Sequence, residues 1–154
     1  MSAAAPAPLY LDYAATTPVD PEVAAVMARY LTADGIFGNA ASATHAYGRE
    51  AAAHLEAARA DVAALVAAPA ESIVSTSGAT ESDNLAILGI ARGLADRGRH
   101  LVTMRTEHKA VLDPCRRLAK EGFDVSWLEP GRDGRLDPQA VRDALRPDTL
   151  LVSV

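Results

Sequence analysis

Two short polar segments of the chain carry residue types suited to binding a ligand. Residues 75–81 combine serine, threonine, glycine and glutamate, and they lead into a helix expected from Ala79 to about Leu94. The first turn of a helix has N–H groups without partners and a partial positive charge, so it can bind a phosphate. Serine and threonine also cap helices without binding any ligand, which leaves both roles open. The segment is not a Walker loop, because no Gly-Lys-Ser/Thr follows.

The second segment, residues 106–109, contains His108 directly after a strand expected at 100–104. Ligands of open α/β sheets bind beyond the carboxyl ends of the strands. A strand is also expected at residues 73–75, so parallel strands would place both polar segments at one edge of the sheet. There, His108 can stack on a flat ring, donate a hydrogen bond or move a proton. A histidine at a helix start can also have no chemical role.

The other histidines and the single cysteine offer weaker candidates. His45 lies in a polar loop, His54 is expected to be solvated on a long helix, and His100 is interpreted as an exposed residue at the start of a strand. The four histidines lack the spacing of metal ligands, so no metal site is predicted. Cys115 precedes two arginines, which can lower a thiol pKa, but a structural cysteine is the preferred interpretation.

The helices and strands expected from the sequence must position these two segments. Up to residue 70, the sequence predicts an extended stretch at 10–13 and helices at about 21–31 and 48–66. From residue 72 onward, strands and helices alternate. The expected strands are 73–75, 100–104, 123–128 and 149–154, and the expected helices are 79–94, 110–121 and 138–145. This alternation predicts an α/β fold with a mainly parallel sheet, flanking helices and right-handed crossovers.

The composition is typical of a soluble globular protein. The 154 residues have a formal net charge of −5, which argues against a nucleic-acid or anionic-membrane partner. No apolar stretch approaches the ~18 residues of a transmembrane helix. A single cysteine cannot form an internal disulfide, which fits a reducing compartment and a cytoplasmic location. Residues 1–8 are expected to form a floppy arm, because they lack the features of a signal peptide.

Four segments taken together resemble the cysteine desulfurases of the iron–sulfur-cluster type, which are class V aminotransferase-like enzymes. The segments are YLDYAATTP at 10–18, FGNAAS at 37–42, TSGATESDN at 76–84 and TEHKAVL at 106–112. Their order and spacing match the family along nearly the whole chain. The resemblance implies the large domain of a fold-type I enzyme that uses pyridoxal 5′-phosphate (PLP). It divides the chain into an arm and extended segment at 1–20, N-terminal helices at 21–70 and the first part of the large α/β domain at 71–154.

The resemblance also implies an activity and a set of site residues. Enzymes of this family take sulfur from L-cysteine, leaving L-alanine and an enzyme persulfide for iron–sulfur cluster assembly. By resemblance, Ala79 and Thr80 contribute to the cup for the cofactor phosphate, and His108 stacks on the pyridine ring and helps proton transfer. A homodimer and a sulfur-acceptor or iron–sulfur scaffold partner are implied as well. The residues implied for the substrate side are Asn39, Ala15 and Thr16.

Groups that this reaction requires are missing from these residues. In the family, the Schiff-base lysine, the acidic partner of the ring nitrogen and the catalytic cysteine lie further downstream. Lys109 follows a histidine, as the Schiff-base lysine does, but its neighbours match the earlier Thr-Glu-His-Lys segment. We therefore assign neither Lys109 as that lysine nor Cys115 as the persulfide carrier. The apolar strand at 149–154 predicts a chain cut in mid-fold, and we expect the 154 residues alone to be inactive and poorly stable.

Two other interpretations remain open at this point. One is a selenocysteine lyase or another class V aminotransferase-like enzyme, which the absent catalytic loop would distinguish. The other is a non-catalytic, short α/β module that binds a phosphate ligand or pairs with another chain through an open sheet edge.

Overall fold

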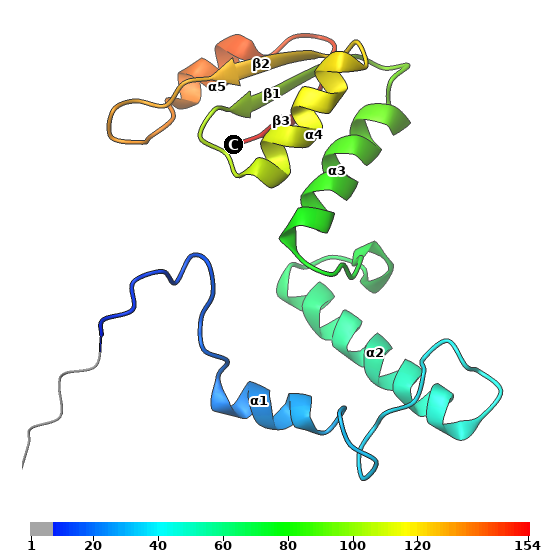
Figure 1. The fold of residues 1–154 in the computed structure, drawn as a ribbon. Coiled ribbons are helices and arrows are strands. Elements are labelled where there is room, and N and C mark those ends of the chain that lie inside the picture. The colour runs from blue at the N-terminus through cyan, green and yellow to red at the C-terminus, as the bar shows by residue number, and fades with distance from the viewer. Residues whose placement is uncertain (1–7) are drawn as a thin grey trace, which may run out of the picture. The chain divides into compact units, whose positions relative to one another are not determined.

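The computed structural model describes residues 8–154, which form two compact units divided between Val74 and Ser75 (Figure 1). The floppy arm expected at the N-terminus lies outside the described residues, except for its last position. Within the described part of the chain, no helix is both long and apolar enough to cross a membrane.

The first unit contains two helices and a short 3-10 turn. Helix α1 spans Pro21–Ala28, α2 spans Ala46–Leu65, and the 3-10 turn η1 spans Ala70–Ser72. The Asp20 side chain caps α1 by accepting a hydrogen bond from the N–H of Glu22 at 2.8 Å. Helix α1 ends three residues before the expected boundary, because the chain then enters a series of turns. Helix α2 begins two residues earlier than expected, because His45 acts as its N-cap.

The prediction of a strand at residues 73–75 is wrong. These residues have no regular structure and follow η1 directly. The carbonyl oxygen of Ile73 accepts a hydrogen bond from the Arg59 guanidinium of α2. A strand exists only through its pairing with a neighbour, and this carbonyl is bonded to a side chain instead.

The second unit is the α/β part of the chain. Its elements are α3 at Ala79–Gly93, β1 at His100–Met104, α4 at Lys109–Lys120, β2 at Asp124–Leu128, α5 at Pro138–Ala144 and β3 at Thr149–Ser153. The strands form a three-stranded sheet in the order β2-β1-β3, and both pairs are parallel. The predicted α/β alternation and parallel sheet are therefore confirmed for this unit.

The connections place helices on both sides of the sheet. The chain moves from central β1 to β2 through α4, then crosses back over β1 to β3 through α5. Because right-handed crossovers in opposite directions lie on opposite faces, α4 and α5 cover different sides of the sheet (Figure 1). Helix α3 lies beside α4, and their apolar faces form the core with β1. The fully buried side chains of this core include Leu101, Cys115 and Leu118.

His100 is buried, so its interpretation as an exposed residue is wrong. It has no exposed surface, and its ring contacts both neighbouring strands. Nδ1 lies 2.8 Å from the Thr149 hydroxyl oxygen of β3, and Nε2 lies 2.9 Å from the Ser126 hydroxyl oxygen of β2. Because β1 is the central strand, its first residue is covered from both sides. Burial holds the pKa of His100 below its ordinary value of 6.5.

Pro114 does not interrupt helix α4. The helix was expected to start late or break there, but it runs continuously from Lys109, with Pro114 in its interior. Proline has no N–H, so the carbonyl of Ala110, four residues earlier, receives no helical hydrogen bond from this position.

Candidate functional site

The N-terminus of α3 is open to a ligand. Its N-cap is Gly78, and no side chain caps the helix, whereas side chains cap α1, α2, α4 and α5. Gly78 has φ 154° and ψ 179°, a region that essentially only glycine adopts. As in the first turn of any helix, the N–H groups of Ala79, Thr80 and Glu81 have no acceptor within the helix. Together with the helix dipole, these donors favour an anion.

The carboxylate of Glu81 holds the residue before the N-cap. It accepts hydrogen bonds from the Ser77 backbone N–H at 2.7 Å and from the Ser77 hydroxyl at 2.6 Å. These two bonds lower the pKa of Glu81 from its ordinary value of 4.5. Glu81 thus orders the turn without using the N–H groups of the first helical turn.

Hydroxyl groups fix the same turn from the other side. The hydroxyl oxygens of Thr76 and Ser82 lie 2.6 Å apart, and they lie 3.3 and 3.2 Å from the Gly78 carbonyl oxygen respectively. Because each hydroxyl has one hydrogen, one of them donates to the other, which donates to the carbonyl. The segment predicted to bind phosphate is therefore a turn of defined shape that precedes an uncapped helix.

His108 lies four residues beyond the carboxyl end of β1, where ligands bind in such sheets. It is the N-cap of α4, and its Nδ1 accepts a hydrogen bond from the Ala110 N–H at 3.1 Å. Because Nδ1 is the acceptor, the neutral ring carries its proton on Nε2. The side chain is exposed, so both the ring face and the Nε2 proton are accessible.

Asn84 joins the two helix starts. Its side-chain nitrogen donates to the Thr80 carbonyl of α3 at 2.9 Å and to the Ala110 carbonyl of α4 at 3.4 Å. Ala79, Thr80 and His108 are thereby held at neighbouring helix starts within one unit. Sequence reasoning did not assign Asn84 a role; its spacing of four residues from Thr80 was the available signal.

The residues expected on the substrate side lie in the first unit, within local turns. Asn39 accepts a hydrogen bond from the Ala41 N–H at 3.0 Å through its side-chain oxygen. The N–H of Ala15 donates to the Asp12 carbonyl at 3.1 Å, and the Thr16 carbonyl accepts from the Tyr10 hydroxyl at 3.1 Å. These contacts order the turns, while the substrate-side role stays a prediction.

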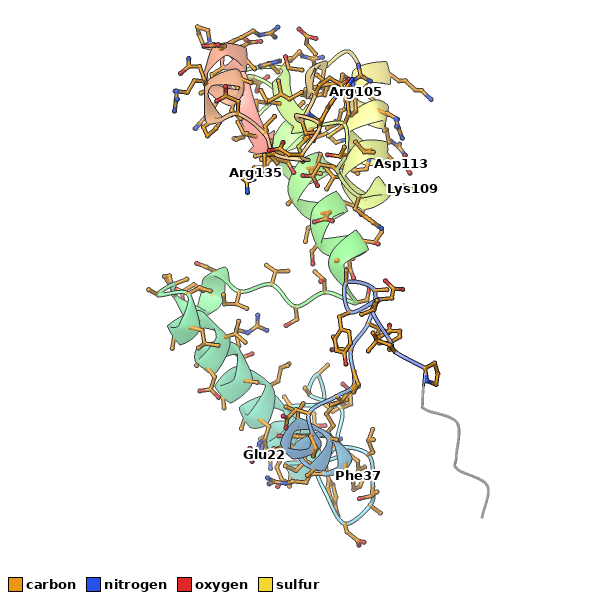
Figure 2. The ribbon with its side chains drawn as sticks, turned by 90° about the vertical axis from the view of Figure 1, so that its left-hand side faces the viewer. Glu22, Phe37, Arg105, Lys109, Asp113 and Arg135 are labelled. Carbon is orange, nitrogen blue, oxygen red and sulfur yellow. The ribbon has the colours of Figure 1, made fainter. Side chains whose placement is uncertain are left out.

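Lys109 and Cys115 have different surroundings on α4. Lys109 lies one turn from Asp113 on the same side of the helix, where both are exposed (Figure 2). Cys115 is buried, and burial, aided by the charge of Glu107, raises the pKa of its thiol to about 11. The neighbouring arginines do not lower this pKa, since Arg116 and Arg117 are exposed and pair with carboxylates.

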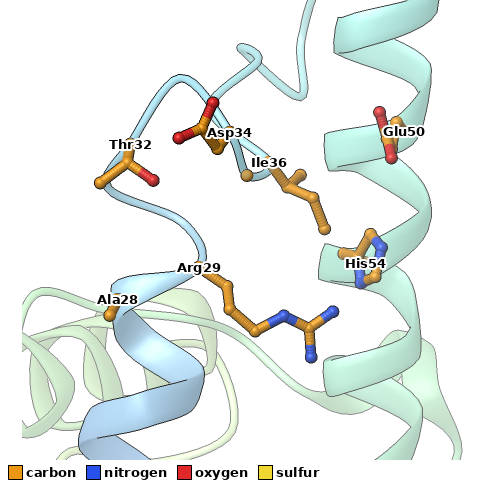
Figure 3. Close-up of a pocket in the computed structure, with 8 residues that line it drawn as sticks. Ala28, Arg29, Thr32, Asp34, Ile36, Glu50 and His54 are labelled. Atoms are coloured by element: carbon orange, nitrogen blue, oxygen red, sulfur yellow. The ribbon is translucent and has the colours of Figure 1, made fainter.

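A cavity of about 560 Å3 lies in the first unit, between the end of α1 and helix α2 (Figure 3). Arg29 extends from α1 toward α2, where Glu50 and His54 lie one turn apart. His54 is half-buried here, and its Nδ1 lies 3.3 Å from the Tyr30 hydroxyl oxygen, so it is less solvated than expected. The lining combines the Arg29 guanidinium with the carboxylates of Asp34 and Glu50, and it contains none of the predicted site residues. Among residues 8–154, no cluster of three or more His, Cys, Asp or Glu residues could hold a metal ion.

Comparison with known proteins identifies the family. Residues 9–154 match the class-V aminotransferase family. The chain is 57% identical over 148 residues to a protein named cysteine desulfurase IscS of Acinetobacter baumannii strain AYE, and 58% identical over 147 residues to one of that name from Anaeromyxobacter sp. strain K. In both cases the match covers 96% of this chain and 36% of the relative, so the chain spans about a third of their length.

A solved structure described as SspA in complex with cysteine superimposes with a TM-score of 0.82 at 40% sequence identity. The match covers 93% of this chain and 40% of that one. The match to the family extends over both units of the chain and includes all four segments on which the resemblance was based. The chain therefore belongs to the class-V aminotransferase family.

Proposed function

We propose that this chain supplies the phosphate-binding and ring-stacking residues of a PLP-dependent cysteine desulfurase. The single observation that carries the proposal is the uncapped N-terminus of α3, joined by Asn84 to the start of α4, where His108 is the N-cap. The names of the similar proteins and their identity to this chain support the same reaction.

The residues present fit the phosphate of PLP. The backbone N–H groups of Ala79 and Thr80 would hold the phosphate, because they have no helical acceptor and lie at the positive end of α3. Gly78 leaves room for a close approach, since no atom lies within 4 Å of the position that a Cβ would occupy. When bound, PLP supplies an electron sink for cleavage of the carbon–sulfur bond.

His108 would act on the ring side of this site. Its exposed imidazole can stack on a flat ring, and its Nε2 holds a proton that it can donate. The bond from the Ala110 N–H to Nδ1 orients the ring and leaves the proton of the neutral ring on Nε2. His108 is the catalytic candidate of this chain.

The proposed substrate is L-cysteine, and the proposed products are L-alanine and an enzyme persulfide used for iron–sulfur cluster assembly. A similar structure described in complex with cysteine supports this substrate. Asn39, Ala15 and Thr16 would contribute on the substrate side. A homodimer, a sulfur-acceptor or scaffold partner and a cytoplasmic location complete the proposal.

The test uses the native gene product. It should bind PLP, which gives an absorption band at longer wavelengths than the absorption of the protein itself. It should also release sulfide from L-cysteine in the presence of a thiol. Borohydride reduction followed by peptide mapping should place the covalently attached PLP at a lysine other than Lys109. His108→Ala should lower turnover, whereas Lys109→Ala, the neighbouring control, should retain covalent PLP.

Two results would contradict the proposal. One is PLP attached to Lys109, and the other is a native product that neither binds PLP nor consumes L-cysteine. Release of selenide from selenocysteine without sulfide from cysteine would indicate the lyase instead. The coding sequence after Val154 gives a further check, because a Ser-Gly-His-Lys segment there would supply the expected lysine.

A further inference from the structure

The proline inside α4 removes one donor from the helix. Pro114 lies five residues after the first residue of α4 and has no N–H to donate to the Ala110 carbonyl. The proline ring also crowds that carbonyl. Ala110 is buried, so water does not readily supply the missing donor.

Asn84 provides a donor at this position. Its side-chain nitrogen lies 3.4 Å from the Ala110 carbonyl oxygen and 2.9 Å from the Thr80 carbonyl oxygen. An amide nitrogen has two hydrogens, so one side chain can serve both carbonyls. The two acceptors belong to the first turns of α4 and α3.

We infer that Asn84 is a positioning residue that replaces the donor lost at Pro114 and holds the start of α4 against the start of α3. The same Ala110 donates its own N–H to Nδ1 of His108. A shift of this residue is therefore passed directly to the histidine ring. Through the two carbonyls, Asn84 sets the spacing between Thr80 and His108; the significance of this spacing for a cofactor rests on the proposed function.

The chemistry of the side chain makes the inference specific to asparagine. Leucine has a similar size but no donor, so it would leave the Ala110 carbonyl unpaired. Glutamine keeps the amide but places it one methylene further out. Asp83, the adjacent residue on α3, points in another direction on the helix and provides a control.

The first experiment is a double-mutant cycle on the native gene product without PLP. Urea unfolding is measured for the wild type, Asn84→Leu, Pro114→Ala and the double variant. Pro114→Ala restores a backbone N–H, so Asn84→Leu should be less damaging in its presence. We expect the effect of Asn84→Leu on the unfolding equilibrium constant to differ about fivefold between the two backgrounds. Equal effects in both backgrounds would overturn the inference.

Hydrogen exchange gives a second measurement that does not depend on the urea transition. In Asn84→Leu, the Ala110 amide should exchange faster, while amides near the C-terminal end of α4 should not change. Asn84→Gln should restore part of the protection, and Asp83→Asn should leave it at the wild-type level. If Asn84→Leu is too unstable to purify, the comparison of Asn84→Gln with the wild type provides the same test. Unchanged exchange at Ala110 in both variants would contradict the link.

The cofactor measurements separate this inference from the proposed function. In folded Asn84→Leu, the PLP dissociation constant should rise about tenfold, and the visible circular dichroism of bound PLP should change, because the ring of His108 is displaced. A wild type that does not bind PLP would refute the proposed function. The double-mutant cycle would still test whether Asn84 replaces the donor lost at Pro114. A wild type that binds PLP, together with an Asn84→Leu variant of unchanged affinity and dichroism, would refute the positioning role alone.

Discussion

Cys115 lies next to two arginines in the sequence, yet its side chain faces the core between α4 and the sheet. Desolvation of the thiolate raises the pKa, aided by the charge of Glu107, while the exposed guanidinium groups of Arg116 and Arg117 pair with carboxylates and do not lower it. The thiol therefore stays protonated at neutral pH and behaves as a small apolar residue. The burial of Cys115 agrees with its preferred interpretation as a structural cysteine, although the two adjacent arginines can lower a thiol pKa.

Cys115 should resist alkylation in the folded protein. With a thiol pKa of about 11 and 1% exposure, it should react with iodoacetamide at pH 8 far more slowly in the native state than in guanidinium chloride. The single cysteine makes the measurement direct, because mass spectrometry of the intact chain reports one site. Equal rates in the two states would show that the thiol is not buried as described.

His100 should make stability depend on pH. Its folded-state pKa lies below 6.5, so between about pH 7 and pH 5 the unfolded chain binds the proton more readily. Its contribution to stability is complete above pH 6.5 and is lost as the pH falls toward the folded-state pKa. The charged groups that act on the ring are Arg146, which lowers its pKa, and Asp124 and Asp148, which oppose that effect.

The variant His100→Leu tests this pH dependence. It should destabilise the protein by about 1–3 kcal/mol at pH 7.5, since the Ser126 hydroxyl loses its partner and the Thr149 hydroxyl keeps only the Arg146 N–H. The difference from the wild type should shrink at pH 5. Urea unfolding at the two pH values measures both effects, and a constant difference would contradict the neutral, buried state of the ring.

At the scale of elements, the start of α3 depends on one backbone conformation. Gly78 combines φ 154° with ψ 179°, and this conformation turns the chain into the helix without a capping side chain. Gly89, in the interior of the same helix, has no atom within 4 Å of a built Cβ and no positive φ. The two glycines therefore differ: Gly78 gives the turn a backbone conformation that other residues rarely adopt, whereas Gly89 has an ordinary helical conformation.

Alanine at these two positions should have opposite effects. Gly78→Ala should destabilise the protein by about 1–3 kcal/mol and weaken PLP binding, because alanine must strain the backbone or move the turn. Gly89→Ala should stabilise it by about 0.5–1 kcal/mol, since alanine favours the helix. Thermal unfolding and PLP titration of the two variants check this contrast, and a neutral Gly78→Ala would show that the turn has no special requirement.

At the scale of the whole molecule, α1 leaves its apolar side chains uncovered. Helix α1 has no buried residue, and the exposed fractions of Val23 and Met27 are 51% and 53%. Other large apolar residues of the first unit are also exposed, including Leu31, Phe37 and Leu65. An apolar surface of this kind favours association.

The 154-residue chain by itself should associate as its concentration rises. We expect larger species in size-exclusion chromatography and binding of a hydrophobic dye, because the side chains of α1 remain accessible. The double variant Val23→Lys with Met27→Lys should reduce both signals, whereas Arg97→Lys, a change at an exposed polar site, should not. A chain that stays monomeric and binds no dye at all concentrations would contradict this expectation.

The sequence predicted most of the elements because their signals are local. The proline after Asp20, the apolar run at 100–104 and the Asp-Pro pair at 137–138 each act over a few residues, and the structure has an element at each place. The prediction of a strand at residues 73–75 was wrong, because a strand depends on a pairing partner elsewhere in the chain. The placement of α4 was off by one residue, since the capping by His108 is a side-chain contact.

The sequence by itself determined the family, the order of helices and strands in the second unit and the two segments of the candidate site. Motif order and hydrophobic period are properties of the chain, so they can be read without coordinates. Only the tertiary structure decided the burial of His100 and Cys115 and the link from Asn84 to the carbonyl freed by Pro114. The hydrogen bonds of His100 and the bond from Asn84 to Ala110 join residues 26 or more positions apart. The proximity of these residues follows from the packing of strands and helices and not from their neighbours in the sequence.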